Sequence, residues 1–147
     1  MPQLLASPAA VPMAQAGDVS LEDFEPPPGA RALVIGHRTL ETLCGLIRHG
    51  CAGAAELRPY DRGGPRPESA EIAVLVDPAS RDETVCSIAM AWRALSGGGR
   101  ILVQDPGGRR HEMEGLLRRQ GFIAISSRET PRGTIVLGRR PFALAQG

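Results

Sequence analysis

The stretch Glu71–Asp105, EIAVLVDPASRDETVCSIAMAWRALSGGGRILVQD, decides the fold of this chain. Its two short apolar runs, Ile72–Val76 and Ile101–Val103, have the length of buried strands. Between them the apolar residues recur at helical spacing, and the glycines Gly97–Gly99 predict a turn into the second strand. A strand, a helix and a strand in this order form a βαβ unit, which joins two parallel strands by a right-handed crossover. The sequence therefore predicts an α/β protein.

Further elements are predicted on both sides of this unit. A strand at Ala32–Ile35, a helix at Thr39–His49 and a strand at Ala52–Leu57 precede it. A helix at Arg110–Gln120 follows it, and then an antiparallel hairpin formed by Phe122–Ser127 and Thr134–Leu137. Ser80 and Glu83 have the S-x-x-E spacing of a capping box at the start of the central helix. The connection over residues 58–70 is rich in proline, glycine and arginine, a composition that predicts no regular structure.

The apolar faces of these elements predict the core. We expect buried side chains on the central strands and the inner faces of the three helices, at Val34, Leu43, Ile47, Val74, Leu75, Ile88, Trp92, Leu102, Leu116 and Leu117. Cys44 and Cys86 fall on the same helical faces, and Cys51 opens a predicted strand. The odd number of cysteines and the lack of a CxxC spacing favour reduced, buried thiols over a metal or redox role.

Length and composition indicate one domain. The chain has 147 residues, a net charge of +1 and 42 % hydrophobic residues, enough for one sizeable core. We expect this domain to cover residues 30–141, after a flexible arm at 1–29 and before a tail at 142–147.

The near-neutral charge and 3 % aromatic content argue against nucleic-acid binding. Prolines at positions 2, 8 and 12 interrupt the N-terminal apolar residues, so we expect no signal peptide, no membrane span and a cytoplasmic location.

The order of elements and their turns resembles the class I S-adenosylmethionine-dependent methyltransferases. ALVIGHRTLETLCGLIRHGC (Ala32–Cys51) is similar to their first strand, nucleotide loop and first helix. AWRALSGGGRILV (Ala91–Val103) is similar to their helix, glycine turn and strand before strand five. GLLRRQGF (Gly115–Phe122) resembles the helix that leads into their closing hairpin. The resemblance covers about residues 31–140.

This resemblance implies a particular sheet. We expect a Rossmann-like, methyltransferase-type sheet that is mostly parallel and ends in a C-terminal antiparallel hairpin. The family places a helix, a third strand and another helix between its second and fourth strands, whereas this chain has only residues 58–70 there. The expected strand order, in the family's numbering of strands, is therefore 2-1-4-5-7-6 with the third strand missing.

Ligands of open α/β sheets bind at the carboxyl ends of the strands, where the strand order reverses. The candidate ligand-binding residues expected at this edge are Gly36, His37, Arg38, Glu56, Asp77 and Asp105. Glu56 follows Gly36 by 20 residues, about the offset of an acid that binds ribose, although it could equally point to solvent. Asp77 and Asp105 each precede a proline and could equally be turn residues. His37 could carry a proton or simply be exposed. The pattern singles out no catalytic residue and no metal ligand.

Two departures from the family pattern bear on function. The family's first loop has an acidic residue followed by glycines at alternate positions, and Gly36-His37-Arg38-Thr39 keeps a single glycine. The missing third strand removes residues that hold the adenine in the family. We therefore expect a degenerate, non-catalytic domain that acts as a small-ligand-binding or partner subunit, with S-adenosylmethionine as a weak ligand and a protein partner or a second copy as its associate.

Two alternatives stay open, and with them the question whether the chain is an enzyme. The first is a minimal active methyltransferase of unknown acceptor that uses Gly36, Glu56 and Asp77 for its cofactor. The second is a domain that keeps the pocket for a different small ligand.

Overall fold

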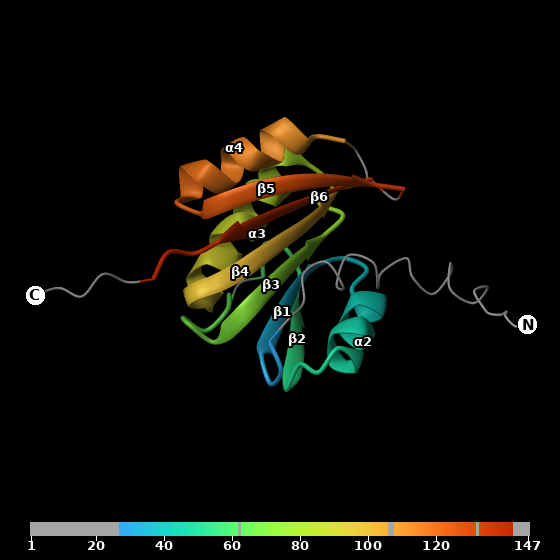
Figure 1. The fold of residues 1–147 in the computed structure, drawn as a ribbon, viewed down its shortest axis with the longest axis vertical. Coiled ribbons are helices and arrows are strands. Elements are labelled where there is room, and N and C mark those ends of the chain that lie inside the picture. The colour runs from blue at the N-terminus through green and yellow to red at the C-terminus, as the bar shows by residue number, and fades with distance from the viewer. Residues whose placement is uncertain (1–26, 62, 106–107, 132, 143–147) are drawn as a thin grey trace, which may run out of the picture.

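The computed structural model describes residues 27–61, 63–105, 108–131 and 133–142, and the side chain of Asp105 is outside this description. Most of the arm expected at 1–29 and of the tail expected at 142–147 lies outside the described residues. The described part forms one six-stranded sheet with three helices (Figure 1). Its elements are β1 (Arg31–Gly36), α2 (Leu40–Arg48), β2 (Gly53–Leu57), β3 (Ala70–Val76), α3 (Arg81–Ala94), β4 (Leu95–Asp105), α4 (Arg110–Gln120), β5 (Ile123–Thr130) and β6 (Gly133–Arg139).

The sheet has the order β2-β1-β3-β4-β6-β5. The strands β2, β1, β3 and β4 run parallel, and β6 pairs antiparallel with both β4 and β5. Neither residues 58–61 nor residues 63–69 contain a helix or a strand. The structure therefore confirms the predicted order with its missing third strand and its antiparallel C-terminal hairpin.

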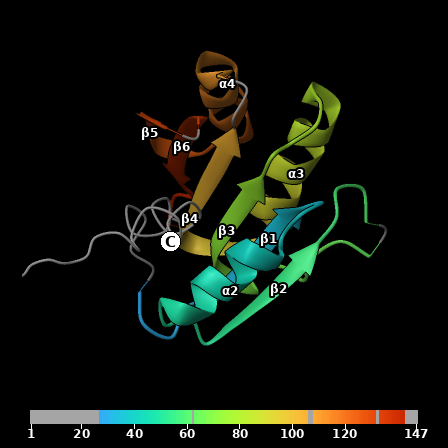
Figure 2. The same ribbon diagram turned by 90° about the vertical axis from the view of Figure 1, so that its right-hand side faces the viewer.

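The helices cover the two faces of the sheet unequally. Figure 2 shows α2 on one face and α3 and α4 on the other. The cluster under α3 and α4 includes Ile35, Leu75 and Leu117, and the cluster under α2 includes Val34 and Leu46.

Seven predicted core residues are buried, namely Val34, Val74, Leu75, Ile88, Leu102, Leu116 and Leu117. Leu43 and Trp92 are partly buried.

The predicted inner face of α2 is wrong. Ile47 is 51 % exposed and Cys44 is exposed, although both were expected in the core. The helix instead buries Thr42, Gly45 and Leu46 against the sheet. Two of these residues are small, which lets the helix approach the strands closely.

The triple glycine before β4 is also misplaced in the sequence prediction. It lies within β4, which begins at Leu95, rather than in a turn before the strand. The register with β3 shifts between Leu95 and Arg100, so the glycines form an irregularity in a continuous strand. Gly98 has a φ of +83°, a conformation that glycine adopts at no steric cost.

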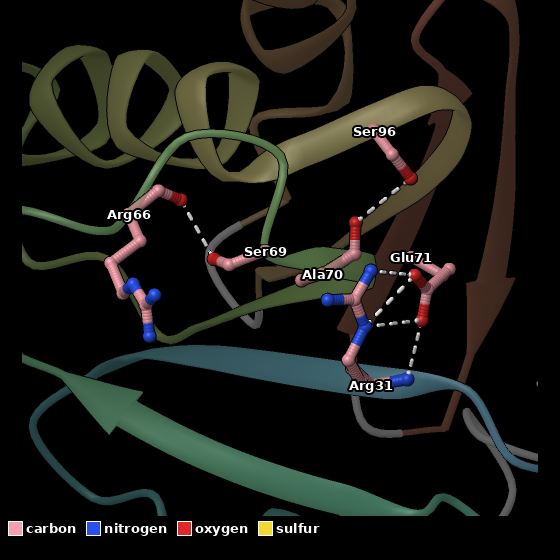
Figure 3. Close-up of polar contacts among 6 residues, drawn as sticks. All are labelled: Arg31, Arg66, Ser69, Ala70, Glu71 and Ser96. Carbon is pink, nitrogen blue, oxygen red and sulfur yellow. Dashed lines mark hydrogen bonds and ion pairs between the residues drawn. The ribbon is translucent and has the colours of Figure 1, made fainter.

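An ion pair joins β1 to β3 at the amino ends of these strands. The backbone N–H of Arg31 donates to Glu71 Oε1 at 2.7 Å, and its guanidinium Nε lies 3.0 Å from Glu71 Oε2 (Figure 3). The hydrogen bond from the Arg31 side chain lowers the pKa of Glu71 below its usual 4.5, against the opposing effect of partial burial. Because the folded-state pKa is the lower one, this contribution to stability is present above about pH 4.5 and is lost as the pH falls through the folded value.

This pair gives a testable pH dependence. We expect Glu71→Gln to have a lower free energy of unfolding than the wild type at pH 6. On acidification to about pH 3 the free energy of unfolding should fall less in Glu71→Gln than in the wild type, because the amide does not titrate. Urea unfolding at several pH values measures both effects. Glu68→Gln, at a nearby exposed carboxylate for which the described residues give no ion pair, is the matched control. Identical pH profiles for Glu71→Gln and the wild type would contradict the assignment.

Candidate functional site

The candidate site lies at the carboxyl ends of β1 and β3, the point at which the strand order reverses. The chain passes from β1 to β2 on one side, and β3 then pairs with β1 on the other. Gly36 ends β1 beside Val76, the last residue of β3, so His37 and Asp77 follow two neighbouring strand ends. The structure thus brings Gly36, His37 and Asp77 to one edge of the sheet, as predicted from the sequence.

Gly36 is tightly packed against β3. A Cβ atom at this position would lie 2.8 Å from the Val76 carbonyl oxygen and 3.3 Å from Val76 Cβ. A single glycine here is therefore required by the approach of two buried strands. The packing of the strands accounts for Gly36 without any contact between its backbone and a ligand.

His37 forms a pair with a carboxylate that the sequence interpretation assigned only to a helix cap. Its Nε2 atom contacts Glu83 Oε2. Glu83 Oε1 accepts a hydrogen bond of 2.6 Å from the Ala79 N–H, and the Glu83 N–H donates to Ser80 Oγ at 3.1 Å. Glu83 is 4 % exposed and is the one buried acidic residue in the described part of the chain, whereas the His37 side chain is 54 % exposed.

The pair has a definite chemical capacity. A buried carboxylate that contacts one ring nitrogen of a histidine holds the ring in one orientation. The other nitrogen, Nδ1, has no partner among the described residues. An imidazole held in this way can exchange a proton with a ligand at the strand ends.

Glu56, the candidate ribose-binding acid, is engaged within the protein. The Thr39 hydroxyl donates a hydrogen bond to Glu56 Oε2 and is itself nearly buried, at 4 % exposure. Thr39 is the N-cap residue of α2, but its side chain makes no cap hydrogen bond to the helix. The contact therefore joins the end of β2 to the start of α2.

Glu56 also lines a groove of about 380 Å³ between the open edge of the sheet and the loop that precedes β3. The groove runs along β1 and β2, and Gly64, Pro65 and Arg66 close it on the loop side. Figure 3 shows the Arg66 side chain extending from this loop toward the strands. Of the six candidate residues, only Glu56 lines this groove.

The remaining candidates contribute less to a shared site. Arg38 is exposed and makes no ion pair within the described residues. Asp77 is exposed, and its N–H donates to the Gln104 carbonyl at 3.2 Å. Its φ of +46° is a left-handed conformation that aspartate tolerates better than most residues, which fits a turn role. Asp105 is the last residue of β4, and its side chain lies outside the described part.

Two classes of site receive no support from the described residues. No group of three or more His, Cys, Asp or Glu side chains there is arranged to hold a metal ion. None of the described helices is long and apolar enough to cross a membrane.

Comparison with known proteins gives a result in three dimensions only. No protein-family model matches the chain, and no curated protein matches its sequence. A solved S-adenosylmethionine-dependent methyltransferase from Mesorhizobium loti has a TM-score of 0.69 at 13 % identity, over 88 % of this chain and 99 % of that one. Phosphoethanolamine N-methyltransferase 2 from Haemonchus contortus has a TM-score of 0.70 at 13 % identity, over 85 % of this chain and 52 % of that one.

A third neighbour bears a different activity. The (4+2)-cyclase SpnF has a TM-score of 0.61 at 13 % identity, over 88 % of this chain and 81 % of that one. The chain spans about half the length of the Haemonchus enzyme and nearly all of the Mesorhizobium protein. These likenesses show that the chain has a class I methyltransferase-like fold.

Proposed function

We propose that this chain is a degenerate methyltransferase-like domain that acts by binding, as a small-ligand or partner subunit, and does not transfer methyl groups. The observation that carries the proposal is that the residues expected to bind the cofactor make contacts within the protein instead. His37 bonds to Glu83, Glu56 bonds to Thr39, and Gly36 packs against Val76. A nucleotide-like ligand would have to break the two side-chain contacts or bind without them.

The energetic consequence is a large loss of affinity. The first loop carries the side chains of His37 and Arg38 where a ligand would approach the backbone. In addition, residues 58–61 and 63–69 contain no strand that could form a further wall of the ligand pocket. Each lost polar contact costs about 1 kcal/mol net. Several such losses move a micromolar ligand toward the millimolar range, because about 1.4 kcal/mol corresponds to a factor of ten.

The fold alone does not imply methyl transfer. Folds of this kind carry several activities, and function resides in the site rather than in the sheet. The likeness to a (4+2)-cyclase at the same level of identity as the likeness to methyltransferases agrees with this rule. The proposal therefore rests on the residues at the strand ends.

One observation favours the alternative of a minimal active methyltransferase. The pair of His37 and Glu83 lies at the edge where Gly36 and Asp77 meet, and it could accept the proton that a methyl acceptor releases. In this alternative Gly36, Glu56 and Asp77 hold the cofactor.

A turnover assay distinguishes the two functions. The full chain is incubated with S-adenosylmethionine and with amine, hydroxyl and thiol acceptors, and S-adenosylhomocysteine is quantified by mass spectrometry. We expect no formation above the rate of the protein-free control. Formation that the wild type catalyses and that His37→Gln abolishes would establish the alternative.

A further inference from the structure

The outer surface of α2 carries a continuous apolar stripe. Leu40 is 74 % exposed, Ile47 is 51 % exposed, and Cys44 between them is also exposed. Residues four and three positions apart lie on one side of a helix, so these three side chains are neighbours. We call Leu40, Cys44 and Ile47 the α2 stripe.

The orientation of the helix makes this stripe unusual. Scattered exposed apolar residues are ordinary, but here one side of a nine-residue helix is apolar while the side that packs on the sheet includes Thr42 and Gly45. A helix with apolar residues on opposite sides is normally buried on both. An aligned and exposed set of this kind indicates a surface that another segment covers.

We propose that Val19–Phe24, a segment of the chain's own N-terminal arm outside the described residues, covers the α2 stripe. The described chain enters the domain beside this helix. The Gly29 N–H donates to the Gly50 carbonyl at 3.0 Å, and Gly50 lies two residues after the last residue of α2. The arm is therefore attached next to the carboxyl end of the helix that it covers.

The arm has sufficient reach for this position. A helix of nine residues is about 14 Å long at about 1.5 Å per residue. The residues from Val19 to Pro26 extend up to about 26 Å at about 3.3 Å per residue. Because the segment is tethered beside its site, its effective concentration there is of the order of millimolar, so a few apolar contacts suffice to hold it.

The composition of the arm fits the surface. Val19, Leu21 and Phe24 supply apolar side chains, and four acidic residues accompany them, Asp18, Glu22, Asp23 and Glu25. Residues 1–26 contain no arginine and no lysine. The stripe is bordered by the exposed side chains of Arg38, Glu41 and Arg48, whose net charge is positive. Opposite charges at the edge of an apolar contact favour one orientation of the segment.

Cys44 provides a native reporter of this contact. The full chain is treated with iodoacetamide, and the alkylation rate of each cysteine is followed by mass spectrometry. We expect Cys44 to react at least about tenfold more slowly in the wild type than in the double variant Leu21→Ser, Phe24→Ser, since covering a thiol limits reagent access. Cys86 on α3 is the internal control, and its rate should not change.

The expected protection is independent of protein concentration, because the contact is intramolecular. Protection that disappears on dilution would instead assign a second copy of the chain to the stripe and overturn the proposal. Equal Cys44 rates in the wild type and the double variant would also overturn it.

Disulfide trapping gives a second test. Under mild oxidation, Leu21→Cys or Phe24→Cys should form a monomeric disulfide with Cys44, and Leu5→Cys, which lies outside the proposed segment, should do so much less. Trapping that is equally efficient from position 5, or that occurs only between chains, would contradict the assignment. The proposal does not depend on whether the domain binds a cofactor.

Discussion

Replacing Trp92 by alanine is expected to lower the free energy of unfolding by about 3 kcal/mol, the lower end of the range for aromatic truncations in a core, because the side chain is partly buried against the core cluster. The indole of Trp92 meets the ring of Phe122 edge to face at a centroid distance of 5.1 Å, and Arg140 Cζ lies 4.7 Å from the centroid of the indole. A guanidinium nitrogen of Arg140 also donates to the Trp92 carbonyl at 2.7 Å. One side chain therefore connects α3, the start of the C-terminal hairpin and the segment after β6.

Circular dichroism in a urea titration measures this effect, because Trp92 is the one tryptophan of the chain and fluorescence would be lost with it. Trp92→Phe is the matched control, since it keeps an aromatic ring beside Phe122 and should cost clearly less. An unchanged midpoint in Trp92→Ala would show that the ring does not contribute to the core.

Gly36→Val is expected to lower the free energy of unfolding by about 1–3 kcal/mol, the range for overpacking in a well-packed core. The added Cβ would lie 2.8 Å from the Val76 carbonyl oxygen, a backbone atom of a buried strand that cannot move aside independently. The same urea titration gives the result. Gly53→Ala in β2 is the control, because a Cβ there meets no atom within 4 Å, and it should change stability much less. Equal, small effects of both substitutions would contradict the packing role of Gly36.

This result has a practical consequence for ligand studies. A Gly36 variant that loses binding would also be destabilised, so the loss would not identify a binding residue. Asp77→Asn is the better probe of the same edge. Asparagine tolerates the left-handed conformation observed at Asp77, with its φ of +46°, and the substitution removes only the charge.

The topology could be predicted from the sequence because few arrangements satisfy it. The βαβ unit at Glu71–Asp105 specifies parallel strands, and the short connection before it leaves no room for a further strand with its helices. The rotation of α2 could not be predicted in this way. Periodicity favoured the side with Leu40, Cys44 and Ile47, whereas the sheet accepts the side with Gly45, because close packing depends on shape as well as on hydrophobicity.

The candidate site shows a similar limit. Strand ends could be located from apolar runs, which is why Gly36, His37 and Asp77 were placed at one edge. The contact between His37 and Glu83 could not be predicted in this way. Glu83 lies 46 residues from His37, and the capping box already gave a reason for an acidic residue at this position. Contacts over such separations depend on the register of the sheet, which local spacing does not encode.

Titration calorimetry of the full chain with S-adenosylmethionine and S-adenosylhomocysteine tests the central claim most directly. The loss of the alternating glycines and of the third strand predicts dissociation constants above about 100 μM for both. Saturable binding in the low micromolar range by the wild type, strongly weakened in Asp77→Asn, would contradict the account and identify a functional cofactor site.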